Sequence, residues 1–324
     1  MKKWFGLAVI AALQFAPALS PASAQNFPSR PIRIVVPFDA GGAMDVVIRI
    51  IAKKIADDGG AQIVIENKTG AGGAIGVVAV KDATPDGYTL LEASSSTHVL
   101  NPHMTANIPY DPVKDFQPIT MLVKVPTFLT VPASLPVKSV KELIEYGRNK
   151  PGGLSYGSAG VGSAPHITGA LFAKATGIPM THVPYRGLAG STADLIAGRI
   201  DFVFGSLPSV QGQVRDGKLK LLAVAGKQRV ARYPDLPSMA DAGFAGVDVD
   251  LWFGVLAPLG TDPAIVRQLH AMFVKATNAP DLAQRWTDQG LEIATNTPDA
   301  FRQAIAADNT RLGPFVKALA PPKQ

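Results

Sequence analysis

Cysteine is absent from this chain of 324 residues. Its absence excludes disulfide bonds, a cysteine-linked lipid anchor, a thiol nucleophile and cysteine-bound metal clusters, so the fold must rely on its packed core. The five histidines form no His-x-x-x-His pair and no zinc-protease motif. We therefore expect neither a metal site nor a cofactor.

Aromatic residues are also scarce, at 7% of the chain, and the lysines and arginines form no stripe interleaved with aromatic side chains. A surface that binds nucleic acid is therefore not expected. The formal charge of +6 at pH 7 is modest, and it suits a small anionic ligand better than a polyanion.

The N-terminal segment has the pattern of a secretory signal peptide. Lys2-Lys3 form its basic start, residues 4–19 its apolar core, and Ala22-Ser23-Ala24 a small-residue cleavage site. The apolar core is too short and too interrupted to span a membrane. We expect cleavage after Ala24 and a soluble exported protein.

Strand and helix patterns alternate along most of the remaining chain. Short apolar runs predict strands at residues 32–36, 62–66, 88–92, 154–156, 181–183, 201–204, 219–225 and 249–255. Helical periodicity and capping patterns predict helices that begin near residues 44, 72, 139, 166, 191, 264, 281 and 299. Such alternation is typical of an α/β fold with largely parallel, doubly wound sheets, whose ligands bind at the carboxyl ends of strands.

Two apolar passages, residues 123–131 and 219–226, are suited to cross between domains, and we take the second as the return crossing. They predict lobe 1 at residues 25–128 and 224–324, and lobe 2 at residues 129–223. The cleft between two such lobes is the default place for a ligand.

The loop after the first strand, residues 38–45, contains Ala40-Gly41-Gly42 and opens a helix. Glycine lets the backbone approach a ligand, and the first N–H groups of a helix carry the positive end of its dipole. The loop therefore predicts a cradle for a negatively charged group.

A second glycine-rich loop, residues 157–166, also joins a strand to a helix and adds the hydroxyls of Ser158 and Ser163. One such loop is equally well explained as a tight connection. Two loops, one in each lobe, favour a ligand between them.

Three further groups are candidates for ligand binding. Tyr185-Arg186-Gly187 follows a strand and offers a guanidinium, although a solvated surface arginine explains it as well. The polar turn at residues 94–97 offers hydroxyl groups. Trp252 offers an apolar wall, although a core position is the stronger interpretation for this residue.

Patterns typical of enzymes are weak. Gly153-Leu154-Ser155-Tyr156-Gly157 matches the hydrolase elbow, but Ser155 lies inside a predicted strand rather than on a sharp turn. The glycines of residues 70–76, with Glu92 about 20 residues further on, offer an alternative function as an exported oxidoreductase that binds a dinucleotide. Their Gly-x-Gly-x-x-x-Gly spacing is weaker than the usual fingerprint.

Several ordered motifs span the mature chain: Pro28-Ser29-Arg30-Pro31, Pro37-Phe38 with Ala40-Gly41-Gly42 and Asp45, Asn67-Lys68 with Gly70-Ala71-Gly72-Gly73, Pro85-Asp86-Gly87-Tyr88, Gly157-Ser158 through His166, Val183-Pro184-Tyr185-Arg186-Gly187 and Gly198-Arg199-Ile200-Asp201. In these the chain resembles the Bug family, the periplasmic solute receptors of tripartite tricarboxylate transport systems. The resemblance implies a two-lobed type II periplasmic-binding-protein (Venus-flytrap) fold, a periplasmic location, no catalysis, a carboxylate ligand and a membrane permease as partner. We expect the receptor to be a monomer.

The resemblance and the residue patterns together give one set of expected ligand-binding residues, none of them catalytic: Phe38, Ala40, Gly41, Gly42, Ala43, Asp45, Ser95, Thr97, Ser158, Gly160, Ser163, His166, Tyr185, Arg186, Gly187, Asp201 and Trp252. Asp39 and Met44 depart from the family, which often has a small residue or proline at the first position and a hydroxyl residue at the second. A carboxylate at the mouth of the cradle repels an anion unless it turns to solvent or meets a cation on the ligand. We expect the solute to be a dicarboxylate, a tricarboxylate, an aromatic acid or an amino acid. Asp39 is equally well explained as an exposed loop residue without a role.

Overall fold

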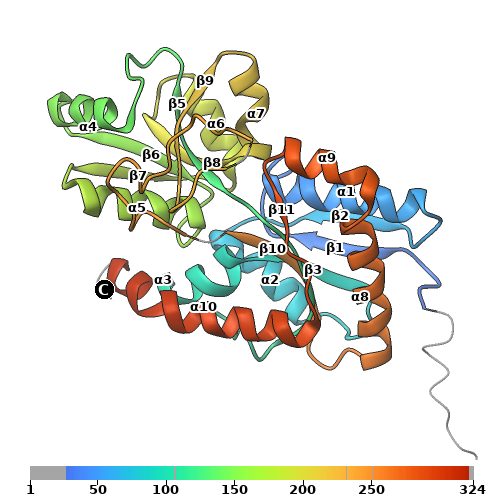
Figure 1. Cartoon of the computed structure of the whole chain (residues 1–324). Helices are drawn as coiled ribbons and strands as arrows, with labels where there is room; N and C mark the ends of the chain where they lie inside the picture. The colour runs from blue at the N-terminus through green and yellow to red at the C-terminus, as the bar shows by residue number, and fades with distance from the viewer. Residues whose placement is uncertain (1–26, 106, 231, 250, 321–324) are drawn as a thin grey trace, which may run out of the picture.

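The computed structural model describes residues 27–105, 107–230, 232–249 and 251–320. The expected signal peptide, its cleavage site and the last four residues lie outside this range. Two sheets, each flanked by helices, are arranged side by side (Figure 1). We call the unit built on the six-stranded sheet lobe 1 and the unit built on the five-stranded sheet lobe 2.

The sheet of lobe 1 has the strand order β11-β4-β10-β3-β1-β2. Its strands are β1 (Ile32–Val36), β2 (Ile63–Asn67), β3 (Thr89–Ser94), β4 (Phe116–Lys124), β10 (Trp252–Pro258) and β11 (Glu292–Ile293). Strand β1 pairs in parallel with β2 and β3, whereas β10 is antiparallel to both β3 and β4. The sheet is therefore mixed, and its parallel part directs the carboxyl ends of β1 and β3 toward lobe 2.

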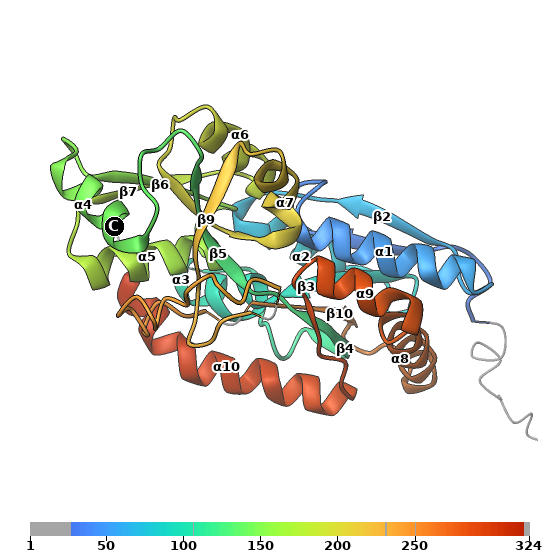
Figure 2. The same cartoon turned by 45° about the horizontal axis from the view of Figure 1, so that its top comes forward.

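The helical segments of lobe 1 are α1 (Ala43–Asp57), the 3-10 turn η1 (Ala71–Gly73), α2 (Ala74–Lys81), the π-helical turn η2 (Ser96–Leu100), α3 (Asn101–Met104), α8 (Pro263–Thr277), α9 (Pro280–Asp288) and α10 (Pro298–Leu319). Helix α1 packs against α8, while α10 packs along β4, η2 and α3. The far end of α10 reaches lobe 2 beside α5, as Figure 2 shows, and there the ammonium of Lys174 lies 5.6 Å from the ring centre of Phe315.

Lobe 2 has the strand order β7-β6-β8-β5-β9. Its strands are β5 (Thr127–Pro132), β6 (Leu154–Ser158), β7 (Met180–Pro184), β8 (Phe202–Ser206) and β9 (Leu219–Val224). Its helices are α4 (Val140–Asn149), α5 (Ala164–Thr176), α6 (Leu188–Ile196) and α7 (Leu207–Arg215). Strand β7, predicted at residues 181–183, is an edge strand that pairs with β6 and remains partly exposed.

The two connections between the lobes differ in length. Only Val125 and Pro126 separate β4 from β5, whereas residues 225–251 separate β9 from β10. The expectation that residues 219–225 form the return crossing is wrong, because β9 pairs with β5 inside lobe 2. The long connection first packs on lobe 2, where the Phe244 ring meets the Phe172 ring edge to face at 5.9 Å.

Local sequence accounts for the helix ends that were predicted. The Oγ of Ser139 accepts a hydrogen bond from the N–H of Glu142 at 3.1 Å, and the Glu142 carboxylate accepts one from the N–H of Lys138 at 2.8 Å. The first bond satisfies an N–H group that the first turn of α4 leaves without a partner in the helix, and the second holds the residue before the N-cap. The capping pattern predicted at residue 139 is confirmed.

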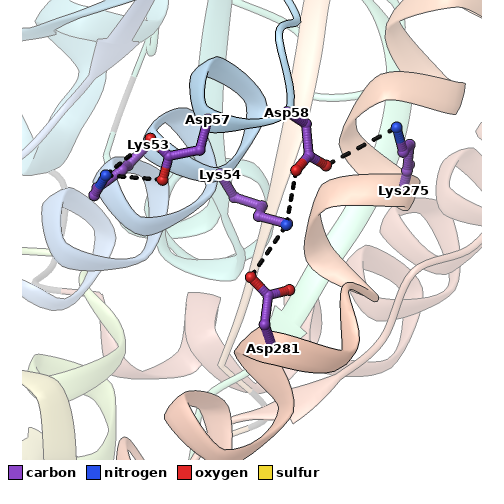
Figure 3. Close-up of polar contacts among 6 residues, drawn as sticks. All are labelled: Lys53, Lys54, Asp57, Asp58, Lys275 and Asp281. Atoms are coloured by element: carbon purple, nitrogen blue, oxygen red, sulfur yellow. Dashed lines mark hydrogen bonds and ion pairs between the residues drawn. The ribbon is translucent and has the colours of Figure 1, made fainter.

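Ion pairs join the end of α1 to α8 and α9 (Figure 3). The Nζ of Lys54 lies 2.8 Å from an oxygen of Asp58 and 3.1 Å from one of Asp281, and Lys275 approaches Asp58 at 3.9 Å. Lys53 pairs with Asp57 one helical turn away, at 2.8 Å. The cluster therefore links three helices of lobe 1 at the end of α1 that is remote from lobe 2.

Candidate functional site

A cavity lies between the lobes, where the carboxyl ends of strands from both sheets meet. It encloses about 470 Å³, including space open to solvent. Its lining residues are Phe38, Asp39, Gly42, Ala43, Met44, Ser94, Ser96, Ala159, Pro165, Leu188, Ser206, Leu251 and Phe253. Residues that follow β1, end β3 and β8, or follow β6 all reach it, as expected for α/β sheets.

Four helices begin at this cavity: α1 in lobe 1, and α5, α6 and α7 in lobe 2. Their N-cap residues are Gly42, Ser163, Gly187 and Ser206, and none of these N-cap side chains caps its own helix by a hydrogen bond. The first turns of helices carry unpaired N–H groups and the positive end of the dipole. The cavity wall therefore attracts an anion, although no described Lys, Arg or His lines it.

Asp45 organises the first loop. Its Oδ2 accepts hydrogen bonds from the N–H of Gly41 at 3.0 Å and from Nε of Arg49 at 2.8 Å. Burial acts to raise the pKa of Asp45, but the bonds from Arg49 and Gly41 outweigh it and lower that pKa. The Gly41 N–H is therefore already used, and Gly41 and Ala40 are exposed rather than at the cavity. Of the ligand-binding residues expected in this loop, Phe38, Gly42 and Ala43 line the cavity.

The second loop is shaped by its own hydroxyls. Ser158 Oγ accepts from the Gly160 N–H at 3.0 Å, and Ser163 Oγ donates to the Gly160 carbonyl at 2.6 Å. Both serine side chains are fully buried. Neither Ser158, Gly160 nor Ser163 lines the cavity; Ala159 and Pro165 do.

Two histidines hold the backbone of the second loop, residues 157–166, in place. The His166 ring stacks on the His182 ring at 4.0 Å, His166 Nδ1 accepts from the Gly162 N–H at 3.1 Å, and His182 Nε2 lies 2.7 Å from Ser158 Oγ. Burial lowers the pKa of both histidines to about 4, and repulsion from His182 contributes at His166. Both rings are therefore neutral near pH 7, and His166 acts on the loop and does not line the cavity.

The polar turn after β3 is a buried helical turn. Thr97 Oγ1 bonds to the backbone of Ser94 at 3.1 Å and to His98 Nδ1 at 2.9 Å, so it holds the turn rather than a ligand. Ser94 and Ser96 line the cavity instead of Ser95 and Thr97. The Oγ of Ser94 is buried and has no hydrogen-bond partner among the described residues. Sequence reasoning located this turn but not which of its residues face the cavity.

Asp201 and Trp252 lie elsewhere, which corrects their assignment to the site. The Asp201 carboxylate bonds to Nζ of Lys150 at 2.6 and 2.7 Å and to the Ser155 N–H at 2.7 Å, near the amino end of β6. Trp252 is buried against Phe301. Because side chains alternate along a strand, its neighbour Phe253 faces the cavity.

Tyr185 and Arg186 border a separate groove that also contains Gly72 and Val161. The Tyr185 hydroxyl donates to Asp194 Oδ2 at 2.6 Å, which keeps it on lobe 2. Gly187, the N-cap of α6, instead contacts Asp39 across the lobes, because a Cβ there would lie 2.9 Å from the Cβ and Oδ2 of Asp39.

Glu92, which the dinucleotide alternative requires at a ribose, is fully buried in lobe 1. Burial and the nearby charge of Asp45 raise its pKa well above the usual value. A carboxyl buried inside the core cannot reach a ribose. Gly72 of the glycine loop at residues 70–76 packs against Val161 of lobe 2, at the border of the outer groove.

Within the described ranges no cluster of His, Cys, Asp and Glu has the geometry of a metal site. None of the helices described there has the length and apolar character that a membrane span requires.

Comparison with known protein families gives one match that covers most of the chain. Residues 47–320 match the tripartite tricarboxylate transporter family receptor, TctC. Among curated relatives, a protein of Pseudomonas sp. strain P51 encoded between tcbD and tcbE is 35% identical, over 94% of this chain and 91% of its own length. BugT of Bordetella pertussis is 33% identical, over 92% of each chain.

Solved structures agree closely with this fold. A Rhodopseudomonas palustris protein with adipate is 33% identical with a TM-score of 0.87, and the match covers 91% of this chain and 99% of that one. MatC from the same organism, with bound malate, is 31% identical with a TM-score of 0.84, over 90% of this chain and 100% of that one.

Proposed function

The chain belongs to the tripartite tricarboxylate transporter receptor family, and from this premise we propose that it captures a small carboxylate-bearing solute between its lobes and delivers it to a membrane permease. The mature protein begins after Ala24 and acts in the periplasm. It binds and releases its solute without chemical turnover. It acts as a monomer and does not bind nucleic acid.

The convergence of four helix N-termini on one cavity carries this proposal. Gly42 begins α1 in lobe 1, and Ser163, Gly187 and Ser206 begin α5, α6 and α7 in lobe 2. Each directs the partial positive charge of its helix dipole toward the cavity, and together these charges suit a carboxylate. A ligand held from both sides favours the closed arrangement of the lobes, since only that arrangement offers both sets of donors.

The structural neighbours support the class of ligand. One is described with adipate and another with malate, both of which are dicarboxylates. We propose that lobe 1 and lobe 2 move as two bodies around such a ligand, with residues 127–224 in the second body. Its direct contacts are the lining residues Phe38, Gly42, Ala43, Ser94, Ser96, Ala159, Leu188 and Ser206.

A thermal-shift screen of carboxylates tests the proposal. Adipate, malate, aromatic acids and amino acids are compared with chloride and sulfate at equal ionic strength, because a ligand that binds only the folded state raises the unfolding midpoint. We expect at least one carboxylate to raise the midpoint and to decrease the radius of gyration measured by small-angle X-ray scattering. If no carboxylate does so while a nicotinamide dinucleotide does, the proposal is overturned.

A further inference from the structure

Asp39 places a carboxylate in the wall of the cavity. It lines the cavity from lobe 1 and is partly exposed. Across the lobes it lies against Gly187, close enough that an added Cβ there would be 2.9 Å from both its Cβ and its Oδ2. The acid therefore sits beside the N-terminus of α6, inside the interface that forms when the lobes are together.

Among the described residues that line the cavity, Asp39 is the only one with an ionisable side chain. The arginines on either side of Asp39 in the sequence, Arg33 and Arg49, are paired with Glu66 and Asp45, each at 2.8 Å. Arg186 borders the outer groove. Nothing on the wall except backbone N–H groups can compensate negative charge. A ligand with two carboxylates would add a second anion near Asp39 without a matching cation, and like charges repel strongly where water is largely excluded.

The remaining wall is mostly apolar. Phe38, Met44, Leu188, Leu251 and Phe253 surround the space. The buried Oγ of Ser94 has no hydrogen-bond partner among the described residues and lines the same cavity. Such a wall suits an uncharged ligand body with one or two polar groups at one end.

We propose, building on the proposed function, that the solute is a zwitterion with an amine next to its carboxylate and an uncharged body, as in an apolar α-amino acid. The carboxylate lies at the N-termini of α1 and of the lobe 2 helices. The ammonium pairs with Asp39, and the body contacts the apolar wall. When the lobes close, both charges of the ligand then have a partner of opposite charge.

Matched ligands test this assignment by calorimetric titration. For each chain length from three to six carbons, the simple acid, its 2-amino acid and the dicarboxylate are compared in the wild-type protein and in Asp39→Asn. Asp57→Asn is the control variant, because it removes one negative charge from an exposed site on α1 that is paired with Lys53. Thermal unfolding without ligand shows whether each variant folds, and Asp39→Ala serves as a second variant.

We expect the wild-type protein and Asp57→Asn to bind a 2-amino acid at least tenfold more tightly than the matched simple acid. In Asp39→Asn and Asp39→Ala this preference should disappear, and the dicarboxylate should bind to these variants more tightly than to the wild type.

If the wild type binds the dicarboxylate more tightly than the amino acid, the inference is overturned, while the proposed capture of a carboxylate remains. Equal loss of all ligands in the Asp39 variants also overturns it, since Asp39 then acts in closure alone. Failure of every acid overturns it too, and the broader screen then decides whether the proposed function falls with it.

Discussion

The Oγ of Ser96 in lobe 1 accepts a hydrogen bond, 2.9 Å long, from the backbone N–H of Ala164 in lobe 2. Ala164 is the first residue of α5, so this N–H has no partner inside the helix. Both residues are buried. The bond therefore exists only when the lobes are together, and it contributes to the closed state rather than to either lobe alone.

Ser96→Ala should weaken ligand binding about tenfold, because a buried N–H without a partner costs roughly 1–2 kcal/mol. The unfolding midpoint without ligand should change little. Calorimetric titration with whichever carboxylate binds measures the effect, with Ser134→Ala at an exposed site of lobe 2 as the control. Unchanged affinity would mean that closure does not require this bond.

Gly187→Ala should hinder closure by steric overlap with Asp39. The backbone of Gly187 is extended, with φ of −169°, so alanine is tolerated there in the isolated lobe. Overpacking of this kind costs about 1–3 kcal/mol. Gly212→Ala is the control, since a Cβ at Gly212 meets nothing within 4 Å. Small-angle scattering with saturating ligand should show incomplete compaction of the Gly187→Ala protein. Adding Asp39→Gly to the same chain should restore full compaction. If the single variant compacts as much as the wild type, the prediction is contradicted.

Asp201→Ala should destabilise lobe 2 by about 2–3 kcal/mol without a change in ligand affinity. The substitution leaves Lys150 without its ion-pair partner and the Ser155 N–H without its acceptor. Urea unfolding and calorimetric titration separate the two effects, with the exposed Asp216→Ala as the control. A large loss of ligand affinity in a folded Asp201→Ala protein would show that Asp201 contributes to ligand binding.

Glu92→Met should stabilise the protein at pH 7 by roughly 1–3 kcal/mol, since both carboxylate oxygens are buried without hydrogen-bond partners among the described residues. Because the pKa of Glu92 is raised in the folded state, the native protein binds this proton more strongly than the unfolded chain does. Wild-type stability should therefore fall as the pH rises above the usual glutamate value, and the variant should lose that part of the dependence. Parallel stability curves from pH 4 to pH 8 would refute this account of Glu92.

His166→Asn should make the protein less sensitive to acid. Burial lowers the pKa of the wild-type histidine to about 4 in the folded state, from its usual value of 6.5. Between pH 6.5 and about pH 4 the unfolded chain therefore binds a proton that the native state does not bind. Stability is lost progressively over that window as the pH falls. Asparagine can still accept from the Gly162 N–H but does not titrate. Urea unfolding at pH 7 and pH 5 tests this, and an equal loss in both proteins would exclude His166 as the origin.

The fold was predictable from sequence where local signals and burial agree. Strand β1 was predicted with the bounds that the structure has, because an apolar run ends there at a proline and a glycine turn. The family resemblance and the two α/β lobes are likewise confirmed. The return connection was misplaced because the apolar run of β9 has the same appearance whether it crosses between sheets or stays in one.

The site was predictable only in part, because a polar residue near a strand end can face a ligand or hold the backbone. Ser163 and Thr97 have hydroxyls in the expected places, yet both bond to nearby backbone atoms. The start of α7 was missed although Ser206-Leu207-Pro208 is typical of a helix N-terminus, with proline in the first turn. That signal, read together with the preceding strand, would have placed Ser206 at the cavity.

Strand β10 has a consequence for how the protein is made. It lies between β3 and β4 and pairs with both, yet its residues come after the whole of lobe 2. As the chain becomes available for folding from its N-terminus, lobe 2 can complete its sheet by residue 224, whereas the edges of β3 and β4 that face β10 stay unpaired until residue 258 follows. The second lobe can therefore assemble first, and the N-terminal third of the chain must wait, still open, for a strand that is synthesised more than 125 residues after β4 ends.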